Sequence, residues 1–207
     1  AHQEDDAGIV SSGKAYIFNV TSGALVHTLD NPNTYGTSAG DTFGRTVAID
    51  GNLAIVGAPG EDDAGGTNSG KAYIFNVTSG ALVHTLDNPN AYGTSEDDSF
   101  GDFVAISGNS AIVGVPDEDD AGGNNSGKAY IFDLTTGALV HTLDNPNPVG
   151  SSADDKFGEG VAISGNLAIV SGFNEDEAGG NNSGKAYIFN VTSGALVHTL
   201  DNPNAYG

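Results

Sequence analysis

The run Gly70-Lys71-Ala72-Tyr73-Ile74-Phe75 decides the fold, because the same six residues recur at equal spacing along the chain. Successive copies begin 57 residues apart, at Gly13, Gly70, Gly127 and Gly184. Residues 58–93 and 172–207 agree at 31 of 36 positions. Such self-similarity predicts that every copy folds alike and packs on its neighbours.

Each repeat carries signals for four short strands. Val47–Ile49 and Leu53–Val56 flank an Asp-Gly turn, which is a strong hairpin signal. Ala72–Val77 and Ala81–Leu86 flank a second turn at Thr78–Gly80. The second hairpin is apolar on both faces, which predicts a sheet packed between neighbouring sheets. The expected units are a half repeat at 1–36 and full repeats at 37–93, 94–150 and 151–207.

The composition favours an all-β repeat protein. The chain has 31 Gly and 7 Pro in 207 residues, which is typical of many short elements joined by turns. We see no long apolar run and no targeting segment, so we expect no membrane insertion. Cys, Met and Trp are absent, which excludes disulfides and thiolate metal sites and suits an extracellular protein.

The charge excludes two classes of partner. The formal net charge is −21, with 27 acidic residues against six Lys and Arg. Nucleic acid and anionic lipid bind to clustered basic residues, so we exclude both as direct partners. Nearly half of the acidic residues, 13 of 27, lie in one recurring loop. Such loops are either solvated or hold cations.

The repeat resembles a known family. Phe43-Gly44 is followed by Gly57-Ala58-Pro59 and then by the Gly70–Phe75 run, an arrangement similar to the FG-GAP repeat. Phe100-Gly101 and Phe157-Gly158 repeat the first element, so the resemblance covers the whole chain. It implies blades of the β-propeller type, as in integrin α subunits and secreted bacterial proteins. It also implies a non-catalytic extracellular module for adhesion or binding, often with calcium.

The position of the family's calcium loop does not carry over, because the first two strands here are joined by a tight turn such as Ser107-Gly108. The acidic loop after the second strand offers oxygen ligands instead, of the kind that calcium takes. The alternative is a loop of solvated acidic turns. The candidate ligands are Asp62, Asp63 and Asn68 with the equivalent sets Asp119, Asp120, Asn125 and Asp176, Glu177, Asn182.

The number of repeats bears on assembly. Closed propellers use four to eight blades, and this chain has about 3.5 units. An open linear stack of hairpin layers is therefore the alternative fold. Unpaired edges and near-identical layers indicate head-to-tail self-association, which generates a filament when it does not close. The other interpretation is a piece of a longer array.

Neither the histidines nor the lysines indicate catalysis. His84 shares a strand face with Leu82 and Leu86, which predicts a packed, hydrogen-bonded histidine between repeats. Lys71 is expected to pair with neighbouring carboxylates. No nucleophile elbow or phosphate-binding loop is present in the sequence, and acid pairs recur in every unit whereas an active site is normally unique. We therefore expect no enzyme activity.

Three function classes remain. The first is a structural or adhesive extracellular protein that assembles into a fibre or surface layer, with calcium in the acidic loops. The second is a discrete propeller that binds a glycan or a surface protein. The third is an accessory domain of a larger secreted enzyme. Sugar sites use exposed aromatic platforms, and the obvious candidates are few: Tyr35, Tyr92 and Tyr206.

Overall fold

The structure is a computed structural model. It describes residues 3–5, 10–33, 39–64, 66–90, 95–120, 123–146, 152–176 and 182–203. Within these ranges the chain forms fourteen β-strands and no helix. Accordingly, the described residues include no helix that could cross a membrane. The tyrosines considered as sugar platforms, Tyr35, Tyr92 and Tyr206, lie outside the described residues.

The strands form four antiparallel sheets, one for each copy of the repeat. The first sheet contains β1 (Lys14–Phe18) and β2 (Leu25–Asp30). The second contains β3 (Val47–Asp50), β4 (Leu53–Ala58), β5 (Lys71–Asn76) and β6 (Leu82–Asp87). The third contains β7 (Phe103–Ser107), β8 (Ser110–Val115), β9 (Lys128–Asp133) and β10 (Ala138–Asp144). The fourth contains β11 (Phe157–Ser164), β12 (Leu167–Gly172), β13 (Lys185–Asn190) and β14 (Leu196–Asp201).

Each full sheet is a simple meander of two hairpins, as the sequence predicted. In the second sheet the spatial order is β3-β4-β5-β6. Ile55 faces Ile74 across β4 and β5, and Ile74 faces His84 across β5 and β6. A register irregularity follows Ile74, close to the turn that ends the hairpin. The buried central strands β4 and β5 are apolar on both faces because other sheets pack against them.

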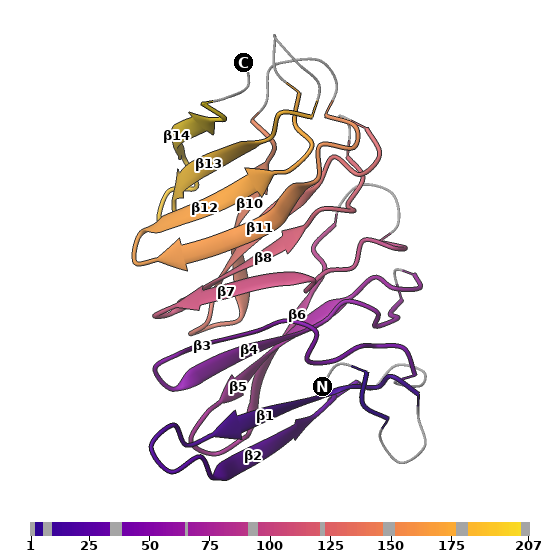
Figure 1. Ribbon diagram of the computed structural model, residues 1–207, viewed down its shortest axis with the longest axis vertical. Helices are drawn as coiled ribbons and strands as arrows, with labels where there is room; N and C mark the ends of the chain where they lie inside the picture. Colours follow the sequence, from indigo (N-terminus) through magenta and orange to yellow (C-terminus); the bar gives the residue numbers. More distant parts are fainter. Residues whose placement is uncertain are drawn as a thin grey trace.

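The sheets stack as open layers along the long axis of the molecule (Figure 1). The β1–β2 sheet lies at one end of the stack and the β11–β14 sheet at the other (Figure 1). The core is divided into three apolar clusters, each shared by two successive sheets. The described strands thus form the open stack and not a closed ring of blades.

Each interface between sheets is centred on the Phe-Gly element. Phe100 is fully buried and lies 6.1 Å from the Tyr130 ring and 6.0 Å from the Phe132 ring, between centroids. Gly101, which follows Phe100, lies against the backbone of the preceding repeat at Gly57. A Cβ added at Gly57 would lie 2.0 Å from the carbonyl oxygen of Gly101, so no side chain fits there.

One packing expectation was wrong. The second hairpin was predicted to be packed on both faces, but its outer strand, β6, leaves Leu82 43% and Val83 41% exposed. The sheet order makes β6 an edge strand. The neighbouring sheet covers the end of β6 that contains the buried Leu86, and it covers less of the end next to the turn, where Leu82 lies. The same pair is exposed in every copy: Leu25 and Val26, Leu139 and Val140, Leu196 and Val197.

Candidate functional site

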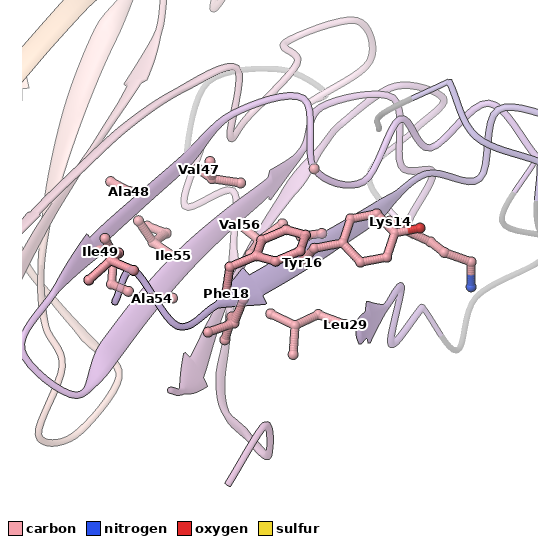
Figure 2. A pocket seen from close by; sticks show the side chains of 14 residues that line it. Lys14, Tyr16, Phe18, Leu29, Val47, Ala48, Ile49, Ala54, Ile55 and Val56 are labelled. Carbon is pink, nitrogen blue, oxygen red and sulfur yellow. The ribbon is translucent and has the colours of Figure 1, made fainter. Parts of the chain in front are cut away.

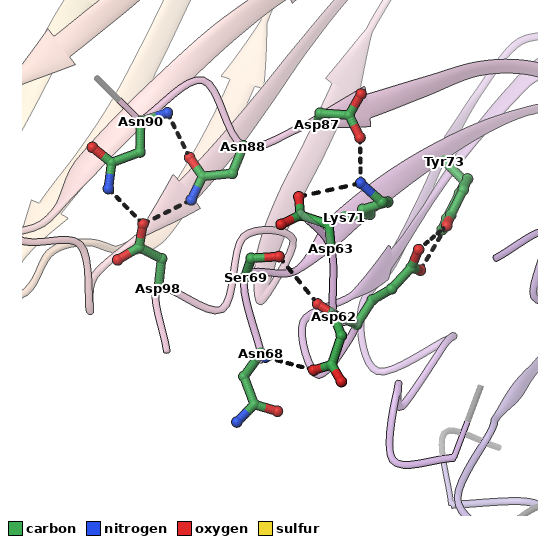
Figure 3. A network of polar contacts seen from close by, with 11 residues as sticks. Asp62, Asp63, Asn68, Ser69, Lys71, Tyr73, Asp87, Asn88, Asn90 and Asp98 are labelled. Carbon is green, nitrogen blue, oxygen red and sulfur yellow. Dashed lines mark hydrogen bonds and ion pairs between the residues drawn. The ribbon is translucent and has the colours of Figure 1, made fainter. Parts of the chain in front are cut away.

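The recurring acidic loop surrounds a buried carboxylate. Glu61 is fully buried, and its two carboxylate oxygens lie 2.7 and 2.6 Å from the hydroxyl of Tyr73, which donates to them (Figure 3). The backbone N–H of Gly70 donates to the carbonyl of Glu61 at 2.9 Å and closes the loop. Glu118 and Tyr130 form the same pair at 2.6 and 2.7 Å.

Burial sets the protonation of these carboxylates. Removal from water raises the pKa of Glu61 to about 7 and that of Glu118 to about 8, although the tyrosine hydrogen bonds oppose the shift. Burial and the glutamate also raise the pKa of Tyr73, which therefore stays a hydrogen-bond donor. The pair is a proton-dependent link between the loop and strand β5.

A second buried carboxylate precedes each Phe-Gly element. Asp98 accepts hydrogen bonds from the side-chain amides of Asn88 and Asn90 at 2.8 and 2.7 Å (Figure 3). Burial raises its pKa to about 6. Asn88 and Asn90 follow the last strand of one repeat, whereas Asp98 begins the next. The Asn-Pro-Asn segment thus joins successive repeats through a buried acid.

Lys71 connects the loop to the outer strand. Its ammonium group pairs with Asp87 on β6 and lies 3.4 Å from the carboxylate of Asp63 (Figure 3). The Lys71 side chain is only 12% exposed. Lys128 repeats both contacts, with Asp144 and with Asp120 at 3.3 Å. The sequence-based expectation that Lys71 pairs with neighbouring carboxylates is confirmed.

Polar side chains also link one repeat to the next. The Asn68 side-chain amide donates to Asp97 at 2.8 Å, and Asn125 donates to Asp154 at 3.0 Å. Arg45 pairs with Asp102, which occupies the same position one repeat later. The acidic residues before the Phe-Gly element therefore bind the loop of the preceding repeat.

His27, His84 and His141 lie between repeats, as predicted. Nε2 of His27 lies 3.0 Å from the carbonyl oxygen of Thr78, in the outer turn of the following repeat. His84 and His141 make the equivalent contacts with Leu134 and Thr192, both at 3.1 Å. These imidazoles hold neighbouring turns together and converge on no common point.

An apolar pocket lies beside the first sheet (Figure 2). It has a volume of about 470 Å³ and is bounded by β1 on one side and by β3 and β4 on the other. Tyr16, Phe18, Val47 and Ile49 line it and are exposed (Figure 2). In each full sheet, an inner strand pairs with the strand that is equivalent to β1. In the second sheet, for example, β5 is equivalent to β1, and β4 pairs with it. Within the described residues, the pocket thus lies where each of the other three sheets has its inner strand pair.

The repeats match the model of the FG-GAP repeat over residues 35–75, 90–132 and 148–189, more than half of the chain. The chain belongs to the FG-GAP repeat family. A comparison with curated proteins found no match. Among solved structures, this FG-GAP chain is similar to the crystal structure of the computationally designed Ika4 protein. That likeness has 12% identity and a TM-score of 0.43, and covers 76% of this chain and 70% of the other.

FG-GAP membership raises the question of calcium, and the candidate ligands do not converge. The Asp62 carboxylate accepts the backbone N–H of Asn68 at 2.9 Å (Figure 3). Asp63 lies against Lys71, and the Asn68 side chain is directed to Asp97 in the next repeat. The three residues are each engaged with a different partner, so this set does not fit a shared cation.

The equivalent residues in later copies are arranged in the same way. Asp119 accepts the N–H of Asn125 at 2.8 Å, and Asp176 accepts that of Asn182 at 2.9 Å. Asp120 lies against Lys128, and Glu177 lies outside the described residues. Within the described ranges, no group of three or more His, Asp or Glu side chains is placed to hold a metal ion. Calcium binding stays a prediction from the sequence.

Sequence reasoning missed the two buried carboxylates. It treated the loop acids as one group, although the four glutamates that begin the loop each precede a tyrosine by twelve residues. That spacing was visible in the sequence: Glu4 and Tyr16, Glu61 and Tyr73, Glu118 and Tyr130, Glu175 and Tyr187.

Proposed function

We propose that this FG-GAP chain is a non-catalytic, extracellular structural or adhesive protein whose repeats assemble into a fibre or surface layer. The observation that carries the proposal is the way one sheet covers the next. The interface is built from the same residues three times along the chain, and its apolar faces are exposed at both ends of the stack. A surface that binds its own repeat supports polymeric assembly.

The polar groups of the acidic loops support a structural role. Glu61, Lys71 and Asp98 each bind residues that hold the loop or join two repeats. The pairs recur in equivalent positions, whereas a catalytic centre is normally a single constellation. An enzyme function therefore has no support in this arrangement.

Electron microscopy of the purified protein tests the proposal, together with light scattering over a range of concentrations. We expect filaments or sheets with a regular axial spacing. Particles that stay monomeric at every concentration and salt condition would contradict self-assembly.

A second candidate function is a binding module for a glycan or a protein. The 470 Å³ pocket favours it, because Tyr16 and Phe18 present exposed aromatic rings there. The equivalent rings in later repeats are buried by neighbouring strands, so their exposure is explained without a ligand. Glycan-array binding that is abolished by Tyr16→Ala would favour this second function.

A further inference from the structure

The turn between the two outer strands of each repeat receives a histidine from the preceding repeat. A Cβ added at Gly80 would lie 2.8 Å from Nδ1 of His27. A Cβ added at Gly137 would likewise lie 2.7 Å from Nδ1 of His84, and one added at Gly194 would lie 2.7 Å from Nδ1 of His141. With the hydrogen bond from each imidazole to a turn carbonyl, this contact occurs three times in one chain.

The two ends of the stack each present one half of this contact. In the first turn, no atom of the described chain lies within 4 Å of a Cβ added at Gly23. At the other end, His198 is exposed on β14, whereas the three earlier histidines are partly covered. In the described part of the chain, no histidine thus contacts the first turn, and no turn covers the last histidine, His198.

The apolar faces show the same complementarity. Tyr16 is 37% exposed on β1, whereas Tyr130 is 2% exposed at the equivalent position. Leu200 is 43% exposed on β14, whereas Leu86 is 1% exposed. In the interior, Leu86 and Ile74 of one repeat pack in one cluster with Tyr130, Phe132 and Leu134 of the next.

We propose that the β13–β14 face of one chain docks on the β1–β2 face of a second copy, head to tail. This inference rests on the proposed self-assembly and names its contact. His198 binds the turn that contains Thr21 and Gly23 of the second copy, and Ile188 and Leu200 cover Tyr16, Phe18 and Val20. The junction continues an interface that the chain already contains three times, so it requires no new type of packing.

The proposed junction involves only the outer strand pair of each sheet, β13–β14 of one chain and β1–β2 of the second copy. Among the residues that the structure describes, the first sheet consists of β1 and β2 alone, so the docked β13 and β14 do not fill the apolar pocket beside β1. Each chain also carries a net charge of −21. Mutual repulsion opposes docking and is screened by salt, so we expect association to strengthen from low to high ionic strength.

Disulfide trapping tests the contact directly, because the chain contains no cysteine. A chain with His198→Cys is mixed with a chain carrying Gly23→Cys and oxidised. An added Cβ at Gly137 lies 3.0 Å from Cγ of His84, a proximity compatible with a disulfide. The internal pair His84→Cys with Gly137→Cys is the positive control, since it carries the same turn strain and should close within one chain.

The matched negative control pairs His198→Cys with Gly51→Cys, which lies in an open turn of the same backbone type. We expect at least tenfold more mixed disulfide with Gly23→Cys than with Gly51→Cys. Equal yields of the two mixed disulfides would overturn the proposal.

A second variant separates this contact from assembly in general. Val20 is fully exposed, so Val20→Glu should leave the melting temperature unchanged and abolish association. Val26→Glu changes an exposed residue of the outer strand, outside the proposed contact, and should leave association intact. Association that persists in Val20→Glu would overturn this contact and keep self-assembly, whereas a wild-type protein that never associates would overturn both.

Discussion

The hydroxyl of Tyr73 lies 2.7 and 2.6 Å from the two carboxylate oxygens of Glu61, and both side chains are buried. The glutamate is one of three adjacent acids, and it alone is directed into the protein. Burial opposes the ionised form of Glu61, whereas the Tyr73 hydrogen bond and the charge of Lys71 favour it, so the loop is sensitive to protonation.

This pair predicts that stability falls as the pH rises. The pKa of Glu61 is raised from an ordinary value of 4.5 to about 7, so the folded state binds more protons than the unfolded state between these values. The stabilisation is complete below pH 4.5 and is lost as the pH rises through 7. At about 1.4 kcal/mol per pKa unit, this rise corresponds to a loss on the order of 3 kcal/mol for Glu61 and a larger loss for Glu118. Urea unfolding across this pH range measures it.

Glu61→Gln with Glu118→Gln is the control for the pH effect. Glutamine is neutral at every pH, and its side-chain oxygen still accepts the hydrogen bond that the tyrosine hydroxyl donates. We therefore expect the double variant to have a shallower dependence of stability on pH. A dependence as steep as in the wild type would show that other groups are responsible.

Removing the charge of Lys71 should destabilise the protein, and removing a neighbouring carboxylate as well should reverse part of that effect. Lys71→Met leaves Asp63 and Asp87 facing each other without the ammonium group, and we expect a loss of about 1–2 kcal/mol in the free energy of unfolding. Adding Asp87→Asn should restore part of that loss, and Lys71→Arg should lose less. Chemical denaturation measures all three. If the second substitution gives no recovery, repulsion between the carboxylates is not the cause.

Chelation tests the predicted calcium. Because Asp62, Asp63 and Asn68 are each engaged elsewhere, we expect the melting temperature to change little when a chelator is added. Mass action would otherwise make the melting temperature rise with calcium concentration. A clear fall after chelation, recovered by calcium and not by magnesium, would show that the loops rearrange around a cation.

His84 and His198 form a matched pair of positions. His84→Ala removes a hydrogen bond between repeats, and we expect a cost of about 1 kcal/mol. His198→Ala should leave the stability of the monomer unchanged, since this histidine is exposed at the end of the stack. Thermal unfolding at low protein concentration compares the two variants. Equal costs would mean that the contact with the next repeat contributes nothing.

A side chain at Gly57 should lower the stability of the protein strongly, for a steric reason. A Cβ there would lie 2.0 Å from the Gly101 carbonyl, so Gly57→Ala forces two repeats apart and should cost more than about 3 kcal/mol. Gly172→Ala is the control, because the added Cβ meets the side chain of Glu175 in the same repeat and not another repeat's backbone. Comparable denaturation midpoints for the two variants would contradict the importance of this approach.

Short-range signals made much of the fold predictable. The Asp-Gly turn after Ile49 and the alternation along Ala72–Val77 are local features, and both hairpins formed as expected. His84 was placed between repeats because strand alternation fixes its face. The exposure of Leu82 could not be read from alternation, since it depends on where the neighbouring sheet ends.

The loop was less predictable for a physical reason. Glu61 and Asp62 are adjacent and chemically alike, and only the three-dimensional position of Tyr73 makes one buried and the other a cap for Asn68. Carboxylates that are close in sequence can therefore have unrelated roles. Counting the acids predicted a cation site, which stays a prediction, and the structure adds a separate partner for Asp62 and for Asp63.

The links from Asn68 to Asp97 and from His84 to the next turn join immediate neighbours in the stack. A chain built in this way resists pulling one layer at a time, because each layer can detach without disturbing those beyond its neighbours. When one 57-residue layer unravels, it releases roughly 200 Å of extended chain. Under tension, the protein is therefore expected to lengthen in steps of similar size, one for each repeat.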